Sequence, residues 1–292
     1  MSKPSILVIG LVALIVLAIA IDRVVAFKVN EITYPVTAHG YILTDEMGHP
    51  LTQVAFTTSD NLTLSGWYLK PQNGVTIIVQ HGWKATSQTM VAIGLMLHRH
   101  GYGVLLFDFR GHGNSQDAQV TLGLTEVNDT NAAVAFLLAQ PETKKIGLVG
   151  ISMGAATGIL AAAENKHIQA IVAEASFAEL KDEVGIGIER QTPLPGWPLD
   201  ELFVLLAQRQ TGRNLQSVAP IRAIGKISPR QVLLLQGGKD KSVLSDSGEK
   251  LFAAAGEPKE IWRDPLPAHG LFFKTMPEAY EQHVIAFFDK LL

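Results

Sequence analysis

A serine between two glycines stands where an apolar stretch passes into a helix-forming one. The segment LVGISMGAATG runs from Leu148 to Gly158 and is centred on Ser152. KIGLVG before the serine is typical of a buried strand, and AATGILAAAENK after it is typical of a helix. So short a connection strains the serine backbone and directs the hydroxyl out at a helix N-terminus, where negative charge is favoured. Ser152 is therefore a candidate nucleophile; the alternative is simple small-residue packing of the helix on the strand.

A serine hydroxyl needs an adjacent base to react at neutral pH, and three histidines follow Ser152 in the chain. His167 closes a helix at ENKH, where a cation is an ordinary end residue. His283 lies in the last helix, within PEAYEQHVIAFFDKLL, and is expected to have a packing role there rather than a catalytic one. His269 lies in the loop DPLPAHG, between a short strand and that helix, where its ring can reach the sheet edge. His269 is the predicted base.

An acid is needed to hold the imidazole tautomer and to stabilise the imidazolium. Asp240 follows VLLLQGGK, just beyond the end of a buried strand, where functional groups of open α/β sheets gather. Asp264, five residues before His269, is the alternative acid. Asp108 precedes the serine and is interpreted as structural. Asp240 is the predicted acid.

Two backbone N–H groups must stabilise the oxyanion that forms when an acyl carbonyl is attacked. Met153, directly after the serine, is expected to supply one. Trp83, in VTIIVQHGWKAT, is expected to supply the other, because Gly82 allows a sharp turn. The Trp83 side chain is then predicted to line the substrate pocket, with His81 structural.

The rest of the chain predicts the sheet that positions these residues. LTQVAFTTSD and NLTLSGWYLKP alternate apolar and polar residues around the turn Ser59-Asp60-Asn61, as an antiparallel hairpin does. Continuous apolar strands then alternate with helical stretches: VTIIVQ, GVLLFD, IGLVG, IQAIVAEA and QVLLLQG. This pattern indicates an α/β fold with a mostly parallel sheet, an antiparallel start and helices on both faces.

The strand and helix rhythm breaks at about 179–228, where TPLPGWPLDELFVLLAQRQ inserts prolines and an amphipathic helix. We expect this insertion to form a small cap over the C-terminal edge of the sheet. Trp197, in its proline-rich loop, is the predicted substrate contact, since small-molecule sites are mostly apolar. Two roles are equally consistent with Leu202, Phe203 and Leu206. They could line the substrate pocket, or they could pack the helix against the core.

An uncharged apolar run from Ser5 to Ile21 opens the chain, at the short end of what spans a bilayer. We expect residues 1–27 to form a transmembrane anchor or signal segment, and 28–292 the catalytic domain. Retention as an anchor is favoured because the run exceeds a usual signal core and resumes at Val24. Cleavage after Ala18-Ile19-Ala20, giving a secreted protein, is the alternative; a buried helix is less consistent with a run that is apolar all round.

The flanking charges conflict over orientation. Lys3 indicates an N-terminus inside, Arg23 and Lys28 oppose it, and an extracytoplasmic catalytic domain is the expectation. A net charge of -3 gives no basic excess for nucleic acid, which is not an expected partner. With no cysteine, the 292-residue chain has no disulfide, thiolate ligand or cysteine nucleophile. No metal or cofactor is expected, and the sequence leaves the oligomeric state undetermined.

The segments HGW, LLFDFRGHGNS, GISMG, EASFAEL, GGKD and AHG, in this order, resemble the α/β-hydrolase superfamily. The similarity covers about 54–292 and is to a branch of serine hydrolases, esterase or serine aminopeptidase-like, that often carries an N-terminal membrane segment. It implies Ser152 as nucleophile, Asp240 as acid, His269 as base, and Trp83 and Met153 as oxyanion donors. The chain departs from the family pattern in Lys84-Ala85, which replaces the usual small glycines, and in Lys239 and Lys241 around the acid.

The expected function is a serine hydrolase that cleaves an ester or other acyl bond in a small-molecule substrate through an acyl-enzyme. A serine peptidase, an aminopeptidase or an acyltransferase would use the same residues. The non-enzymatic alternative is a binding protein with the same fold. The complete set of Ser, Asp and His argues against it.

Overall fold

A mixed sheet forms the centre of the structure, a computed structural model that describes residues 3–292. Within those residues the sheet has eight strands in the order β1-β2-β4-β3-β5-β6-β7-β8. β1 pairs antiparallel with β2 and β2 antiparallel with β4, whereas all later pairs are parallel. The strands are β1 (Gln53–Thr57), β2 (Thr63–Leu69), β3 (Val75–Gln80), β4 (Gly103–Phe107), β5 (Lys145–Ile151), β6 (Ile168–Glu174), β7 (Gln231–Gly237) and β8 (Lys259–Asp264). The predicted hairpin and parallel sheet are confirmed.

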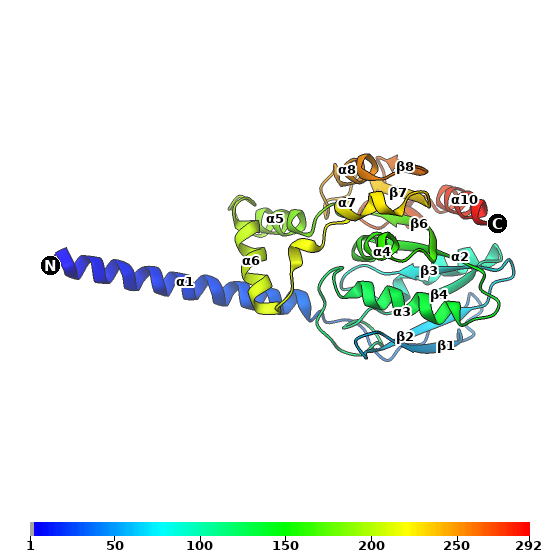
Figure 1. Ribbon diagram of the computed structural model, residues 1–292, viewed down its shortest axis with the longest axis horizontal. Helices are drawn as coiled ribbons and strands as arrows, with labels where there is room; N and C mark the ends of the chain where they lie inside the picture. Colours follow the sequence, from blue (N-terminus) through cyan, green and yellow to red (C-terminus); the bar gives the residue numbers. More distant parts are fainter. Residues whose placement is uncertain (1–2) are drawn as a thin grey trace.

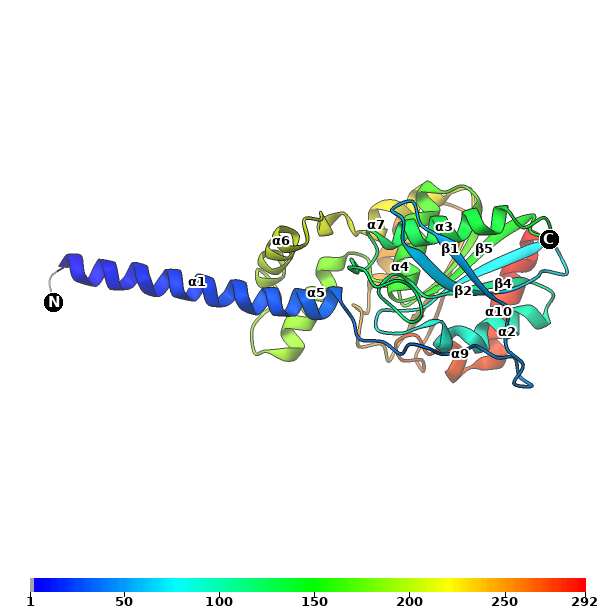
Figure 2. The same cartoon turned by 90° about the horizontal axis from the view of Figure 1, so that it is seen from below.

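Helices cover both faces of the sheet, as predicted (Figures 1 and 2). The apolar core divides between the two faces: α3, α4 and α8 pack with η3 on one, and α2, α9 and α10 on the other. Every residue of β3 and β4 is buried, which explains their continuous apolar sequences. The helices of the domain are η1 (Ser87–Met90), α2 (Val91–Arg99), α3 (Glu126–Leu138), α4 (Met153–Glu164), α7 (Pro220–Ala223), η3 (Ile224–Ile227), α8 (Ser247–Ala254), α9 (Phe272–Thr275), α10 (Pro277–Phe288) and η4 (Asp289–Leu291).

A long N-terminal helix, α1 (Lys3–Thr33), projects away from the domain (Figure 1). Its segment Val8–Thr33 is long and apolar enough to be a membrane anchor or a signal sequence, and almost none of it is buried. The helix continues past the expected boundary at residue 27 because its C-terminal part has packing partners. Val25 and Val29 are buried among apolar residues of the insertion between β6 and β7.

That insertion has a projecting part and a part that joins the domain. α6 (Leu199–Thr211) lies against the C-terminal part of α1, and α5 (Leu180–Gln191) packs on α6 (Figure 1). After η2 (Leu215–Ser217), the short helices α7 and η3 pack on α4. We call the projecting part, residues 180–217, the cap. The cap expected at about 179–228 lies within the segment that joins β6 to β7.

Candidate active site

The turn between β5 and α4 has the strained geometry expected from its sequence. Ser152 has φ 56° and ψ −119°, a conformation that is rare outside glycine. A Cβ on Gly150 would lie 2.4 Å from the carbonyl oxygen of Gly154, and a Cβ on Gly154 would lie 2.6 Å from that of Gln80. Both positions therefore require glycine. The Ser152 amide donates to the Glu174 carbonyl at 2.8 Å, which ties the turn to β6.

The structure brings Ser152, His269 and Asp240 into one hydrogen-bonded line. His269 Nε2 lies 2.9 Å from Ser152 Oγ, and its Nδ1 lies 2.8 Å from Asp240 Oδ2. The three side chains come from the ends of β5 and β7 and from the loop after β8. Because parallel strands all end at one edge of the sheet, residues 152, 240 and 269 meet there. This arrangement can move a proton from the serine hydroxyl to the imidazole.

Asp240 is the better placed of the two candidate acids. Its side chain is 1% exposed, and Oδ1 accepts hydrogen bonds from the amides of Ser242 at 2.7 Å and Val243 at 3.3 Å. Asp264 instead accepts a hydrogen bond from the Leu266 amide at 2.8 Å, within its own loop. No hydrogen bond joins Asp264 to His269 within residues 3–292.

The loop after β3 lies against the serine. A Cβ on Gly82 would come within 3.3 Å of the Ser152 Cβ, so glycine permits this close approach. Two buried histidines hold the loop: His81 Nε2 accepts from the Phe109 amide at 3.1 Å, and His112 Nε2 accepts from the Lys84 amide at 3.3 Å. Burial and the neighbouring His112 lower the pKa of His81 to about 4, so its ring is neutral at pH 7. These contacts give His81 the structural environment that was expected.

The two amides expected to bind an oxyanion flank the serine. Met153 is the first residue of α4, where an N–H has no partner within the helix. Trp83 follows Gly82 in the loop against the serine. Its side chain is turned towards α1, because the indole Nε1 donates to the Ile32 carbonyl at 3.0 Å. The Lys84 ammonium lies 4.4 Å from the centre of the Trp83 ring. Contact between this indole and substrate stays a prediction.

A buried carboxyl group that the sequence analysis did not identify lies behind the triad. Glu174, the last residue of β6, is fully buried, and its Oε1 accepts from the Phe272 amide at 3.0 Å. Phe272 begins α9, just after the His269 loop, so this bond positions that loop. Burial raises the pKa of Glu174 to about 7, against the opposing effect of the Phe272 hydrogen bond. The sequence did contain a signal for this residue. EASF places a glutamate at the end of a buried strand, next to the strand that leads to Ser152.

A second carboxyl group comes from the cap. Burial, followed by the charges of Asp240 and Asp182, raises the pKa of Glu183 on α5 to about 8. The charge of Asp240, the candidate acid, thus acts on a residue of the cap. Sequence reasoning had no basis for this, since the position of α5 relative to the triad depends on tertiary packing.

The other predicted site residues lie apart from the triad. His167 follows α4 and is exposed. His283 stacks on Trp262 with ring centres 4.1 Å apart, which agrees with its expected packing role. Trp197 is 72% exposed in the loop before α6, and its contact with substrate stays a prediction. No cluster of metal-ligating side chains occurs within residues 3–292.

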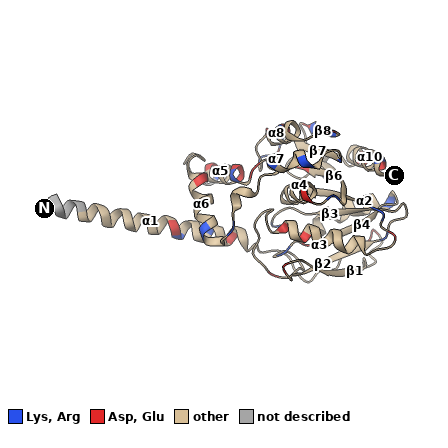
Figure 3. Ribbon diagram, in the orientation of Figure 1, with Lys and Arg blue, Asp and Glu red and all other residues tan. Residues whose placement is uncertain are grey.

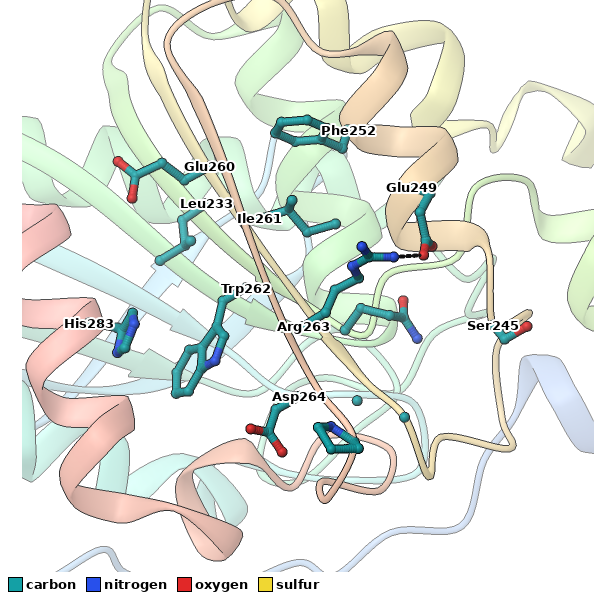
Figure 4. A pocket seen from close by; sticks show the side chains of 14 residues that line it. Leu233, Ser245, Glu249, Phe252, Glu260, Ile261, Trp262, Arg263, Asp264 and His283 are labelled. Carbon is teal, nitrogen blue, oxygen red and sulfur yellow. Dashed lines mark hydrogen bonds and ion pairs between the residues drawn. The ribbon is translucent and has the colours of Figure 1, made fainter.

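A cavity of about 920 Å³ lies along β7 and the edge strand β8 (Figure 4). Leu233, Ile261 and Trp262 form part of its wall, and the Arg263–Glu249 ion pair crosses one side. None of the triad residues lines it. The cavity is therefore separate from the candidate active site.

Comparison with known families assigns the chain. The family model described as Hydrolase_4, serine aminopeptidase S33, matches residues 71–227, more than half of the sequence. The chain belongs to this hydrolase family. The matched range contains the nucleophile turn and the loop of Trp83, whereas Asp240 and His269 lie beyond it.

Relatives of this hydrolase share most of its length. The uncharacterized protein YqkD of Bacillus subtilis (strain 168) is 27% identical over 239 residues, covering 78% of this chain and 76% of the relative. The Pyrococcus furiosus esterase Pf2001 has a similar structure, with a TM-score of 0.73 and 26% identity over 88% of this chain and 98% of the esterase. The thiohydrolase aneE of Aspergillus aculeatus is 34% identical over 139 residues, 44% of each chain. The chain is therefore a hydrolase with the α/β-hydrolase fold.

Proposed function

We propose that this hydrolase cleaves an ester or other acyl bond through an acyl-enzyme, with Ser152 as nucleophile, His269 as base and Asp240 as acid. The observation that carries the proposal is the continuous hydrogen-bonded line from Ser152 through His269 to the buried Asp240. The likeness to an esterase structure supports the bond class.

In the proposed reaction, Ser152 Oγ attacks the acyl carbon while His269 Nε2 takes its proton. The amides of Trp83 and Met153 stabilise the oxyanion, each donor contributing about 2.7–4 kcal/mol. His269 returns the proton to the leaving alcohol, thiol or amine, which departs and leaves the acyl-serine. A water molecule then attacks the acyl-serine with His269 as base, which releases the acid and restores Ser152. No metal or cofactor takes part in this scheme.

The test is labelling of the full chain by a fluorophosphonate, which reacts with activated serines. Ser152→Ala should abolish labelling and lower hydrolysis by at least about 10⁴-fold. Ser245→Ala, at an exposed serine beside the cavity of Figure 4, is the matched control and should label normally. Labelling that persists in Ser152→Ala and disappears in Ser245→Ala would refute the assignment.

An aminopeptidase is the second candidate, favoured by the description of the matching family. It would use the same triad but would release an amino acid. Comparing acyl esters of graded chain length with aminoacyl amides separates the two. Hydrolysis of the amides alone would replace the esterase proposal with the aminopeptidase.

We also propose that α1 is a retained anchor, with the catalytic domain outside the cytoplasm. The apolar run and the packing of Val25 and Val29 on the cap support it, because cleavage after Ala20 would leave these residues at a new N-terminal end. The full chain should then stay with membranes through a carbonate wash. A mature protein that begins at Ile21 by mass spectrometry would replace the anchor with a signal peptide.

A further inference from the structure

α6 carries exposed apolar side chains on the side opposite its packed one. Val204 and Ala207 are buried in an apolar cluster with residues of α1 and α5. Leu202 and Leu205 lie on the opposite side of the helix, 41% and 59% exposed. A helix with apolar residues on both sides is expected to be buried on both sides. In the described part of the chain, α6 is packed on one side only.

The loop before α6 also carries exposed apolar side chains. Leu194 is 51% exposed and Trp197 is 72% exposed. We call Leu194, Trp197, Leu202 and Leu205 the outer face of the cap. Exposure of these large apolar side chains to water is unfavourable, and their burial against a partner would be favourable.

α1 leaves the molecule beside this face. The Arg209 guanidinium at the end of α6 pairs with Asp22 of α1 at 2.5 Å. Asp22 is the first charged residue after the apolar run that ends at Ile21, so the end of α6 lies level with the end of that run. In Figure 3 the described part of α1 that projects beyond the cap is tan, and its first charged colours appear close to the cap.

The apolar run of α1 is at the short end of what spans a bilayer. Ser5–Ile21 contains 17 residues, which extend about 26 Å in a helix, a little less than the roughly 30 Å of the hydrocarbon core. α6 crosses the axis of α1 steeply in Figure 1, on the side of the cap towards which α1 projects. If α1 spans the membrane, α6 lies along its surface. Trp197 in the preceding loop and the leucines of α6 are of the types that occur at membrane interfaces.

We infer that the outer face of the cap rests in the interfacial layer of the phospholipid bilayer that α1 crosses. The inference rests on the proposed retention of α1 as an anchor. On its other side, α6 packs against α1 and α5. The outer face and the anchor therefore belong to one packed unit of helices.

The absence of cysteine from the sequence allows a direct test. Single-cysteine variants of the full chain, labelled with the fluorophore NBD, are reconstituted in phosphatidylcholine vesicles that contain nitroxide lipids. Leu205→Cys reports on the outer face, and Val12→Cys reports on the anchor. Leu138→Cys is the matched control, because Leu138 is 51% exposed but ends α3 at the edge of the sheet opposite the triad.

We expect the Leu205→Cys label to emit at shorter wavelength than the Leu138→Cys label and to be quenched at least about twofold by shallow nitroxides. Deep nitroxides should quench Val12→Cys most strongly, and neither set should quench Leu138→Cys. Quenching at Val12→Cys with none at Leu205→Cys would overturn the docking and leave the anchor intact. No quenching at Val12→Cys would overturn the anchor proposal and this inference together. Fluorophosphonate labelling of the same vesicles reports separately on the serine hydrolase assignment.

Discussion

The nucleophile turn and the cap differ in how tightly their residues are held. At the turn, backbone atoms approach so closely that two glycines have no room for a Cβ, and the residues around Ser152 are almost wholly buried. In the cap, a Cβ on Gly187 would meet no atom within 4 Å, and several leucines face outwards. The difference indicates that packing against the sheet holds the candidate catalytic residues in place. The cap has more room for substitutions, because fewer of its atoms are closely packed.

The largest expected effect concerns the candidate catalytic acid near the nucleophile turn. Asp240→Asn should lower kcat by about 10⁴-fold, because an amide cannot hold the His269 tautomer as a carboxylate does. Asp264→Asn is the control and should keep most activity, since Asp264 bonds only within its own loop. Greater loss in Asp264→Asn, with both variants folded by circular dichroism, would transfer the acid role to Asp264.

The next effect concerns buried charge. Glu174 has a folded pKa of about 7 against 4.5 for an ordinary glutamate, so the unfolded chain loses its proton first as pH rises. The contribution of Glu174 to the free energy of unfolding should therefore fall between about pH 4.5 and 7. Glu174→Gln removes this loss, so its stability relative to wild type should increase over the same range by on the order of 3 kcal/mol.

Denaturant unfolding of the full chain in detergent at several pH values measures this difference. Glu201→Gln, at an exposed position on α6 of the cap, is the control and should show no such trend. A flat difference for Glu174→Gln would mean that Glu174 is already ionised in the folded protein.

A paired glycine substitution compares the two regions directly. Gly154→Ala should lower the free energy of unfolding by about 1–3 kcal/mol, since its Cβ would meet the Gln80 and His81 carbonyl oxygens at 2.6 Å. Gly187→Ala, in the middle of α5, should raise it by about 0.5–1 kcal/mol through helix propensity. Thermal melts of the two variants provide the measurement. Equal losses in both would show that the cap is packed as tightly as the turn.

The smallest expected effect lies at the cap surface. Trp197→Ala should change the ratio of kcat/KM between short and long acyl esters by about tenfold or less, while fluorophosphonate labelling of Ser152 persists. Leu138→Ala, which removes an exposed apolar side chain far from the cap, should leave the ratio unchanged. An unaltered chain-length profile in Trp197→Ala would remove the predicted substrate contact and leave the indole only its place on the outer face of the cap.

The sequence by itself determined the hydrolase sheet and the local geometry of the nucleophile turn. Strand burial follows from continuous apolar runs, and the strain at Ser152 follows from Gly150 and Gly154, because both are properties of neighbouring residues. The order of Ser152, Asp240 and His269 also predicted which strand ends would meet. These signals are local in sequence or repeat with the period of a strand or helix.

Only the tertiary structure decided what surrounds those residues. It separated Asp240 from Asp264 by hydrogen-bond partners, turned the Trp83 indole towards Ile32, and placed Glu174 and Glu183 near the acid. It also extended α1 to Thr33 against the cap. Each of these outcomes depends on contacts between segments far apart in the chain, and the energy of such contacts is set by packing and burial that no single segment encodes.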